Sequence, residues 1–314
     1  MVKFAFAFIV FFIWMNTALG KTPVEAHGWL SVKGPNIVNQ YGEVVALKGM
    51  SSHGLQWFGN VITKERMQDL RDNWRSTIFR SAMYTKEGGY IDNPSVKNKM
   101  LEIINWSIEL GMYVIVDWHI LRDNNPQTYQ GQAVDFFTDI SSRYAGYPNV
   151  LYELCNEPNG NVSWAGNIKP YAMEVSKAIR QNDPNNIILV GSGSWSQNIQ
   201  DPAADPLPYS NVAYTLHFYS GTHGQWLRDR IDQARAKGIA IYVSEWGTTD
   251  SSGGGGLYLD AAKTWLSFLE SRNIGWTNWT YSNAGESSAA LTNNFRLTQS
   301  GQFVKDNMNW NIFP

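Results

Sequence analysis

Short runs rich in β-branched and aromatic residues alternate along the chain with longer segments whose apolar residues recur at helical spacing. The short runs predict strands at Val45–Met50, Thr77–Met83, Tyr113–Trp118, Val150–Cys155, Ile187–Gly191, Ala213–Phe218, Ile241–Ser244 and Trp276–Tyr281. The longer segments predict helices at Lys64–Asn73, Ser95–Leu110, Ala133–Tyr144, Lys169–Gln181, Gln225–Ala236 and Leu257–Glu270. This alternation is typical of an α/β fold of the (β/α)8 TIM-barrel class and less so of an open doubly wound sheet.

A β-hairpin is predicted ahead of the first strand. The segments involved are Trp29–Lys33 and Asn36–Leu47, and the second contains the turn signal Asn39-Gln40-Tyr41-Gly42. We expect this hairpin to close the bottom of the barrel.

Two common nucleotide motifs are missing from the pattern. No G-x-G-x-x-G follows the first strand, and the glycine run Gly253–Gly256 lacks the Lys-Ser/Thr of a phosphate-binding loop. The sequence therefore favours neither a dinucleotide site nor a P-loop.

The N-terminus has the pattern of a secretory signal peptide. Lys3 precedes an apolar run from Phe4 to Met15, and the small-residue segment Ala18-Leu19-Gly20 follows. We expect residues 1–20 to be removed and residues 21–314 to form one secreted, extracellular domain. No later stretch reaches about 18 consecutive apolar residues, so no membrane span is predicted.

Composition adds a strong aromatic excess. Trp 14, Tyr 15 and Phe 14 make up 14% of the chain, whereas charged residues make up 17%, against roughly a quarter in ordinary domains. A large core accounts for about half of the tryptophans; the others favour a ligand with flat apolar faces and polar edges, as sugars have. The net charge of −2 argues against nucleic acid or an anionic membrane as partner.

Polar residues gather where the predicted strands end, and in a barrel these ends converge on one face. The candidates are Ser52 and His53, Arg80, Asp117–His119, Asn156–Pro158, His217–Tyr219, Glu245–Gly247 and Trp279. Each alone has an ordinary structural explanation, such as a helix cap or a buried ion pair. Their coincidence at one end predicts an active site.

Glycoside hydrolysis needs two carboxyl groups in opposite protonation states. Glu157 and Glu245 follow the fourth and seventh predicted strands, on opposite sides of the barrel mouth. With Arg80 beside it and Tyr219 donating a hydrogen bond, Glu245 would stay ionised as nucleophile. Its charge would raise the pKa of Glu157, which would keep its proton for the glycosidic oxygen.

Metal-dependent hydrolysis is the rival chemistry. No H-x-x-x-H, H-E-x-x-H or Cys/His ligand spacing occurs in the chain. We therefore predict that no metal or other cofactor is needed.

Six motifs between Gly28 and about Asn293 resemble those of a known family. They are GMSSHG (Gly49–Gly54), VDWHIL (Val116–Leu121), YELCNEPN (Tyr152–Asn159), LHFY (Leu216–Tyr219), VSEWGT (Val243–Thr248) and ESSAAL (Glu286–Leu291). Their order resembles glycoside hydrolase family 5, specifically its bacterial-type endo-β-1,4-glucanases. This implies a secreted cellulase that cleaves internal β-1,4-glucosidic bonds with retention, through a covalent glycosyl-enzyme.

The resemblance also implies residue roles. It makes Glu157 the proton donor and base and Glu245 the nucleophile, with further catalytic positions at Arg80, His119, Asn156 (on the sugar 2-OH), His217 and Tyr219. Implied substrate contacts are His53, Trp57 and Tyr84 on the non-reducing side, Trp195 on the leaving-group side, Trp279 under the sugar at the cleavage site, and Glu286. Ala284 replaces a lysine that bacterial relatives usually have two residues before Glu286, which implies one sugar contact fewer.

Several alternatives stay open. A β-mannanase or mixed-linkage glucanase would share this catalytic set, and a carbohydrate-binding protein that lost catalysis would need a damaged glutamate, although both are present. The expected partner is a β-glucan polysaccharide or oligosaccharide bound by a monomer. Asn105-Trp106-Ser107 and Asn161-Val162-Ser163 match the pattern of N-glycosylation sites.

Overall fold

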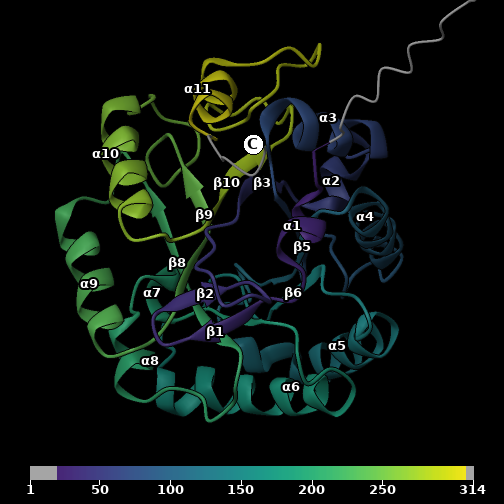
Figure 1. Cartoon of the computed structure of the whole chain (residues 1–314), viewed down its shortest axis with the longest axis vertical. Helices are drawn as coiled ribbons and strands as arrows, with labels where there is room; N and C mark the ends of the chain where they lie inside the picture. The colour runs from purple at the N-terminus through teal and green to yellow at the C-terminus, as the bar shows by residue number, and fades with distance from the viewer. Residues whose placement is uncertain (1–19, 309–314) are drawn as a thin grey trace, which may run out of the picture.

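The computed structural model describes residues 20–308, so all but the last residue of the predicted signal peptide lies outside the described chain. Eight parallel strands close into a barrel in the order β10-β3-β4-β5-β6-β7-β8-β9, surrounded by helices (Figure 1). The strands are β3 (Lys48–Ser52), β4 (Ile78–Tyr84), β5 (Tyr113–His119), β6 (Val150–Glu153), β7 (Ile188–Val190), β8 (Val212–Tyr219), β9 (Ile241–Gly247) and β10 (Trp276–Tyr281). The predicted TIM barrel is confirmed.

Long helices follow most strands. They are α3 (Lys64–Trp74), α4 (Val96–Leu110), α5 (Gln130–Tyr144), α6 (Lys169–Asn182), α9 (Gln225–Ala236), α10 (Leu259–Glu270) and α11 (Gln299–Asn307). Shorter turns are α1 (Pro23–His27), α2 (Leu55–Phe58), η1 (Gly59–Val61), η2 (Pro126–Tyr129), η3 (Trp164–Ile168), α7 (Gly193–Ser196) and α8 (Gln200–Ala204).

Helix α4 illustrates why these segments form where they do. Its buried residues Met100, Ile103, Ile104 and Leu110 share one face, which packs on strands β4 and β5. The helix ends at Gly111, whose φ of 65° is left-handed and whose N–H bonds back to the carbonyl of Ile108. This is the glycine stop that the sequence predicts.

The first barrel strand begins later than the sequence indicates. The predicted strand starts at Val45, but β3 starts at Lys48, because the preceding residues belong to the barrel floor. The Val45 N–H donates to the carbonyl of Ile37 at 2.9 Å, and Leu47 is buried among the first residues of the strands.

The N-terminal hairpin is present but turns elsewhere. Strands β1 (Ser31–Lys33) and β2 (Asn36–Val38) are antiparallel, so the chain reverses between residues 33 and 36. The predicted turn at Asn39–Gly42 is present, because the Asn39 side chain accepts hydrogen bonds from the Tyr41 and Glu43 N–H groups, but it is a second turn that follows β2.

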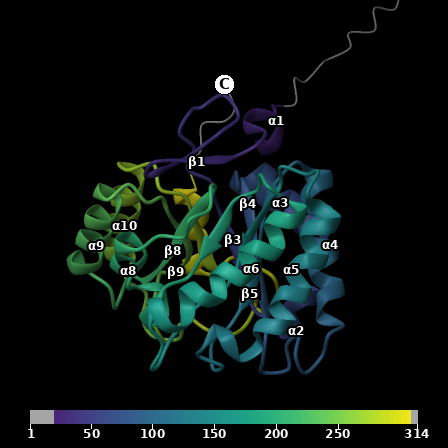
Figure 2. The same ribbon diagram turned by 90° about the horizontal axis from the view of Figure 1, so that it is seen from below.

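The hairpin covers one end of the barrel, as Figure 2 shows. Leu30 and Ile37 pack with Ile78, Tyr113 and other residues from the starts of the barrel strands. In addition, the Tyr113 hydroxyl donates to the Gly28 carbonyl at 2.6 Å. The hairpin thus fills the bottom, which leaves the carboxyl ends of the strands as the open face.

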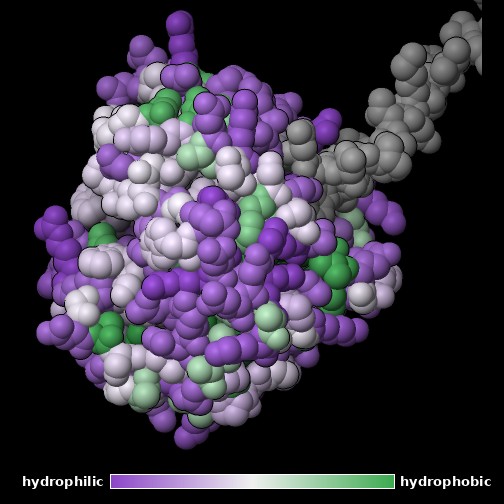
Figure 3. Space-filling model, turned by 90° about the vertical axis from the view of Figure 1, so that its left-hand side faces the viewer, coloured by the Kyte–Doolittle hydropathy of each residue, from purple (hydrophilic) through white to green (hydrophobic). Residues whose placement is uncertain are grey.

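The outer helices face water. On the side that carries α9 and α10 the surface is mostly hydrophilic, with small scattered apolar spots (Figure 3). Among the described residues, none of the helices is long and apolar enough to cross a membrane.

Candidate active site

A cavity of about 670 Å³ opens at the carboxyl ends of the strands. Ten of the predicted site residues line it: His53, Tyr84, His119, Glu157, Trp195, His217, Tyr219, Glu245, Trp279 and Glu286. Arg80 and Asn156 lie buried beneath it. Trp57 lies outside its lining and instead packs on Tyr84, with ring centroids 5.0 Å apart.

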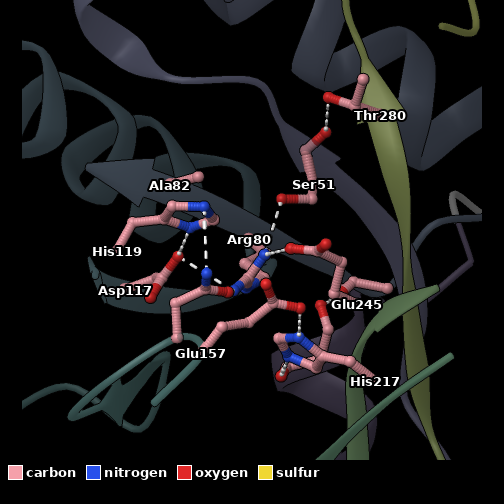
Figure 4. Close-up of polar contacts among 12 residues, drawn as sticks. Ser51, Arg80, Ala82, Asp117, His119, Glu157, His217, Glu245 and Thr280 are labelled. Atoms are coloured by element: carbon pink, nitrogen blue, oxygen red, sulfur yellow. Dashed lines mark hydrogen bonds and ion pairs between the residues drawn. The ribbon is translucent and has the colours of Figure 1, made fainter. Parts of the chain in front are cut away.

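Arg80 on β4 is the centre of the buried network (Figure 4). Its guanidinium donates to Glu245 Oε2 at 2.9 Å and to Glu153 Oε2 at 2.7 Å. It also donates to Asn156 Oδ1 at 2.6 Å and lies 3.0 Å from Asp117 Oδ2. A planar fork of donors on a fully buried side chain fixes the direction of each acceptor.

Glu245 is held ionised. Its second oxygen, Oε1, accepts a hydrogen bond from the Tyr219 hydroxyl at 2.8 Å. Burial pushes the pKa of Glu245 upward, but the positive charges of His217 and Arg80, together with the Tyr219 bond, lower it overall. A buried carboxylate that stays charged can serve as a nucleophile.

Glu157 has the opposite tendency. Burial raises the pKa of Glu157, and the negative charge of Glu245 raises it further, against a hydrogen bond from His217. One carboxyl oxygen of each glutamate and a ring nitrogen of His217 lie within 4.8 Å of one another. Two neighbouring carboxyl groups with pKa values displaced in opposite directions suit an acid and a nucleophile.

His217 determines which oxygen of Glu157 can carry a proton. Its Nε2 lies 2.9 Å from Ser244 Oγ, and that hydroxyl donates to Glu153 Oε1 at 2.6 Å, so Nε2 must bear hydrogen. Burial lowers the pKa of His217, but hydrogen bonds to Glu153 and Glu157 raise it to about 9. The imidazolium therefore donates through Nδ1 to Glu157 Oε1 at 2.8 Å, which leaves Oε2 as the oxygen that can carry a proton.

His119 is neutral, with its tautomer set by neighbours. Burial and the charge of Arg80 lower the pKa of His119 to about 3. Because Asn156 Oδ1 accepts from Arg80, its Nδ2 donates to His119 Nε2 at 3.2 Å. His119 therefore carries its hydrogen on Nδ1 and donates to Asp117 Oδ2 at 2.6 Å.

Asn156 is more enclosed than a direct sugar contact requires. Its Nδ2 also donates to the Ile120 carbonyl at 3.1 Å, so both amide hydrogens are used within the protein. A contact with the sugar 2-OH therefore either replaces one of these two bonds or uses the second lone pair of Oδ1, whose other lone pair accepts from Arg80.

Trp279, which the resemblance places under the sugar at the cleavage site, is more enclosed than an open platform would be. It is only 6% exposed, because His119 stacks on it at 5.4 Å and His53 packs at 4.9 Å. The peptide bond after it is cis. Trp279 still lines the cavity, so it forms part of the cavity wall instead of an open platform.

Glu286 lies next to Trp279 in the cavity wall. It accepts hydrogen bonds from Ser288 at 2.9 Å and from the Trp279 side chain, and its Oε1 lies 4.0 Å from His53 Nε2. Burial raises the pKa of Glu286, and none of the groups acting on that pKa is a lysine or arginine. Position 284, where the family resemblance implies a lysine, is alanine.

Trp195 lies on the other side of the catalytic pair and is 48% exposed. The turn that carries it is unusual, since Ser194, Trp195 and Ser196 all have left-handed φ values of 55° to 57°. The Trp195 N–H donates to the Pro158 carbonyl at 3.1 Å, and the Ser196 hydroxyl donates to the Asn156 carbonyl at 2.7 Å. The segment that contains Glu157 thus holds this turn in place.

Comparison with known proteins identifies the family. Residues 38–285 match the model of the cellulase family, glycosyl hydrolase family 5. The chain belongs to glycosyl hydrolase family 5. Endoglucanase N of Pectobacterium atrosepticum is 50% identical over 299 residues, which cover 92% of this chain and 67% of that protein. Endoglucanase 5 of Pectobacterium carotovorum subsp. carotovorum is also 50% identical, over 92% of this chain and 59% of that protein.

Comparison with solved structures supports the same family. The catalytic domain of Thermobifida fusca endoglucanase Cel5A has a TM-score of 0.89 and 37% identity, over 92% of this chain and 99% of that one. The predicted resemblance to family 5 endoglucanases is confirmed, and the barrel is an endoglucanase domain. The chain spans about three fifths to two thirds of the length of the two Pectobacterium relatives.

Several residues of this family 5 site were not predicted. Glu153 and Ser244 lie inside strands β6 and β9, yet both belong to the Arg80–His217 network. A charged residue in an apolar strand such as VLYE signals a buried partner, and that signal was available for Glu153. Trp226 and His223 also line the cavity, but no strand-end position marks Trp226.

A metal site is geometrically conceivable at one place. Among the described residues, Glu157, His217 and Glu245 form the one group with suitable ligand atoms close together. His217 Nδ1 and Glu157 Oε1 are already bonded to each other, so a metal would have to replace that bond. Independence from metals remains a prediction.

Arg80→Leu is expected to destabilise this family 5 barrel. The ionised carboxylates of Glu153, whose pKa is lowered to about 2, and Glu245 would lose their buried cation, at a cost of about 3–5 kcal/mol. Urea unfolding at pH 7 measures this cost. Arg143→Leu, which breaks an exposed i,i+4 pair with Asp139, is the control and should leave the midpoint unchanged; equal midpoints for both variants would contradict the account.

Proposed function

We propose that the whole protein is a secreted endo-β-1,4-glucanase that hydrolyses internal bonds of cellulose and related β-glucans with retention of anomeric configuration. The observation that carries this is the pair Glu157 and Glu245, with oxygens within 4.8 Å and pKa values shifted in opposite directions. Retaining enzymes place their carboxyl groups about 5–5.5 Å apart, whereas inverting enzymes need about 6.5–9.5 Å for a water between them.

In the first step Glu245 attacks the anomeric carbon. Its carboxylate oxygen forms the new bond while the bond to the glycosidic oxygen breaks. Glu157 gives its Oε2 proton to that leaving oxygen, so the departing glucan carries a hydroxyl. The products of the step are a glycosyl ester on Glu245 and an ionised Glu157.

In the second step the roles reverse. Ionised Glu157 takes a proton from water, whose oxygen attacks the anomeric carbon from the side that the leaving group vacated. The ester bond breaks and Glu245 returns to a carboxylate. Two inversions restore the β configuration.

The groups around the two glutamates stabilise the negative charge on either of them. When Glu157 becomes ionised, the His217 imidazolium already donates to it through Nδ1, so the new negative charge is stabilised without movement. Arg80 and Tyr219 stay on the Glu245 side, where the carboxylate is released at the end of the cycle.

The cavity supports a glucan chain as substrate. Aromatic rings lie on both sides of the catalytic pair, Trp279 with His53 and Tyr84 on one and Trp195 on the other. A variant of the Thermobifida fusca domain, 36% identical to this chain with a TM-score of 0.88, has been solved with cellotetraose. Secretion is supported by the signal-peptide pattern of residues 1–20.

Two assays on the same preparation test the proposal. Reducing ends should appear rapidly from carboxymethyl cellulose and far more slowly from mannan, and NMR of a cello-oligosaccharide digest should show the β-anomer as the first-formed product. A preference for mannan would make the protein a mannanase. An α-anomer formed first would exclude retention.

A further inference from the structure

A second exposed tryptophan shares the cavity with Trp195. Trp226 is 45% exposed and lines the cavity, as do the nearby Gln197, Thr222 and His223. Trp195 follows β7 and Trp226 follows β8, so both lie on the side of the catalytic pair away from Trp279 and His53, which belong to β10 and the end of β3.

Packing does not explain Trp226. It is the second residue of α9, and that helix attaches to the barrel through Leu227, Ile231 and Ala234. Trp226 is absent from the apolar cores of the described chain. A large apolar side chain that faces a cavity and contributes nothing to the core is typical of a ligand-binding surface.

The ring is nevertheless held in position. The Arg230 guanidinium, one helical turn away, lies 4.8 Å from the centroid of the Trp226 ring. Arg230 also donates to Asn198 Oδ1 at 3.1 Å and to the Gln197 carbonyl at 3.4 Å. These residues directly follow the turn that carries Trp195, so one arginine joins the supports of the two tryptophans.

His223 places Trp226 relative to the nucleophile. Its ring lies 5.9 Å from that of Trp226, and its Nδ1 accepts the Tyr219 N–H at 2.8 Å. Tyr219 in turn donates to Glu245. Trp226 is thus linked to Glu245 through His223 and Tyr219, by one ring contact and two hydrogen bonds.

We propose that Trp226 is a second platform on the leaving-group side, which stacks on a glucosyl unit beyond the one on Trp195. The ligand class is the apolar face of a β-1,4-linked glucopyranose. Arg230 covers one face of the indole, and the face toward the cavity receives the sugar. The inference rests on the proposed endoglucanase activity and adds a chain-length preference to it.

The test compares substrates that do and do not reach this platform. Trp226→Ala should lower kcat/KM for cellohexaose about 3- to 10-fold, the range expected for loss of one aromatic contact. It should leave an activated aryl cellobioside unchanged, because that leaving group ends at the first position. Trp226→Phe should recover most of the cellohexaose rate.

Tyr147→Ala is the matched control. Tyr147 is a 43% exposed aromatic residue in the loop between α5 and β6, at the opposite end of the barrel. Its replacement by alanine should change kcat/KM for neither substrate. An unchanged kcat/KM for cellohexaose in Trp226→Ala, or an equal loss of kcat/KM on both substrates, would contradict the proposal that Trp226 is a platform. Wild-type protein that cleaves neither substrate would instead refute the proposed function.

Discussion

Glu245→Gln is expected to abolish hydrolysis of glucans and aryl cellobiosides alike, by on the order of 10⁴- to 10⁶-fold in kcat. The amide cannot form the glycosyl ester, so a better leaving group gives no relief. The neighbours of Glu245 motivate this prediction, because Arg80 and Tyr219 bond to its two oxygens and lower its pKa with His217. Initial rates on carboxymethyl cellulose and on an aryl cellobioside measure the effect.

Glu109→Gln controls for a general effect of the same chemical change. Glu109 lies on the surface in an ion pair with Lys64, and this variant should keep full activity on both substrates. A Glu245→Gln variant that still cleaves the aryl cellobioside rapidly would contradict the assignment of Glu245 as nucleophile.

Glu157→Ala is expected to affect substrates differently according to their leaving group. Glucans, whose alkoxide leaves poorly, should lose about 10²- to 10⁴-fold in kcat/KM, whereas an activated aryl cellobioside should form the glycosyl-enzyme at nearly the normal rate. The ester would then accumulate, because the base for water is missing. A burst of phenolate followed by slow turnover in stopped-flow records is the expected signature; equal losses on both substrates would contradict it.

The same variant changes the pH profile. Wild-type kcat/KM should rise as pH increases through the lowered pKa of Glu245 and fall as pH increases through the raised pKa of Glu157, on either side of their ordinary 4.5. Glu157→Ala should lose the falling limb with the aryl cellobioside and keep the rising one. A falling limb that persists would assign it to another group.

The sequence predicted those parts of the site that follow from where parallel strands end. Glu157 follows β6 by four residues and Glu245 lies two residues before the end of β9, so the barrel geometry brings both to one mouth. The contact of Arg80 with Glu245 followed from the same reasoning. Loop conformation and the direction of each ring could not be predicted in this way.

Trp279 shows the limit most clearly. Its position at the end of β10 predicted a cavity residue, but only three-dimensional packing shows that His53 and His119 cover its ring. The left-handed turn at Trp195 has no glycine to indicate it. The Asn39–Gly42 turn signal was correct as a turn, but the strands β1 and β2 reverse before it.

The most direct test of the two catalytic assignments is the stereochemistry of azide rescue. In Glu157→Ala, azide should attack the glycosyl ester on Glu245 and give a β-glycosyl azide from an aryl cellobioside. In Glu245→Ala, azide should replace the missing carboxylate and give the α-glycosyl azide. NMR of the isolated product distinguishes them, and an α-azide from Glu157→Ala would mean that the two glutamates have exchanged roles.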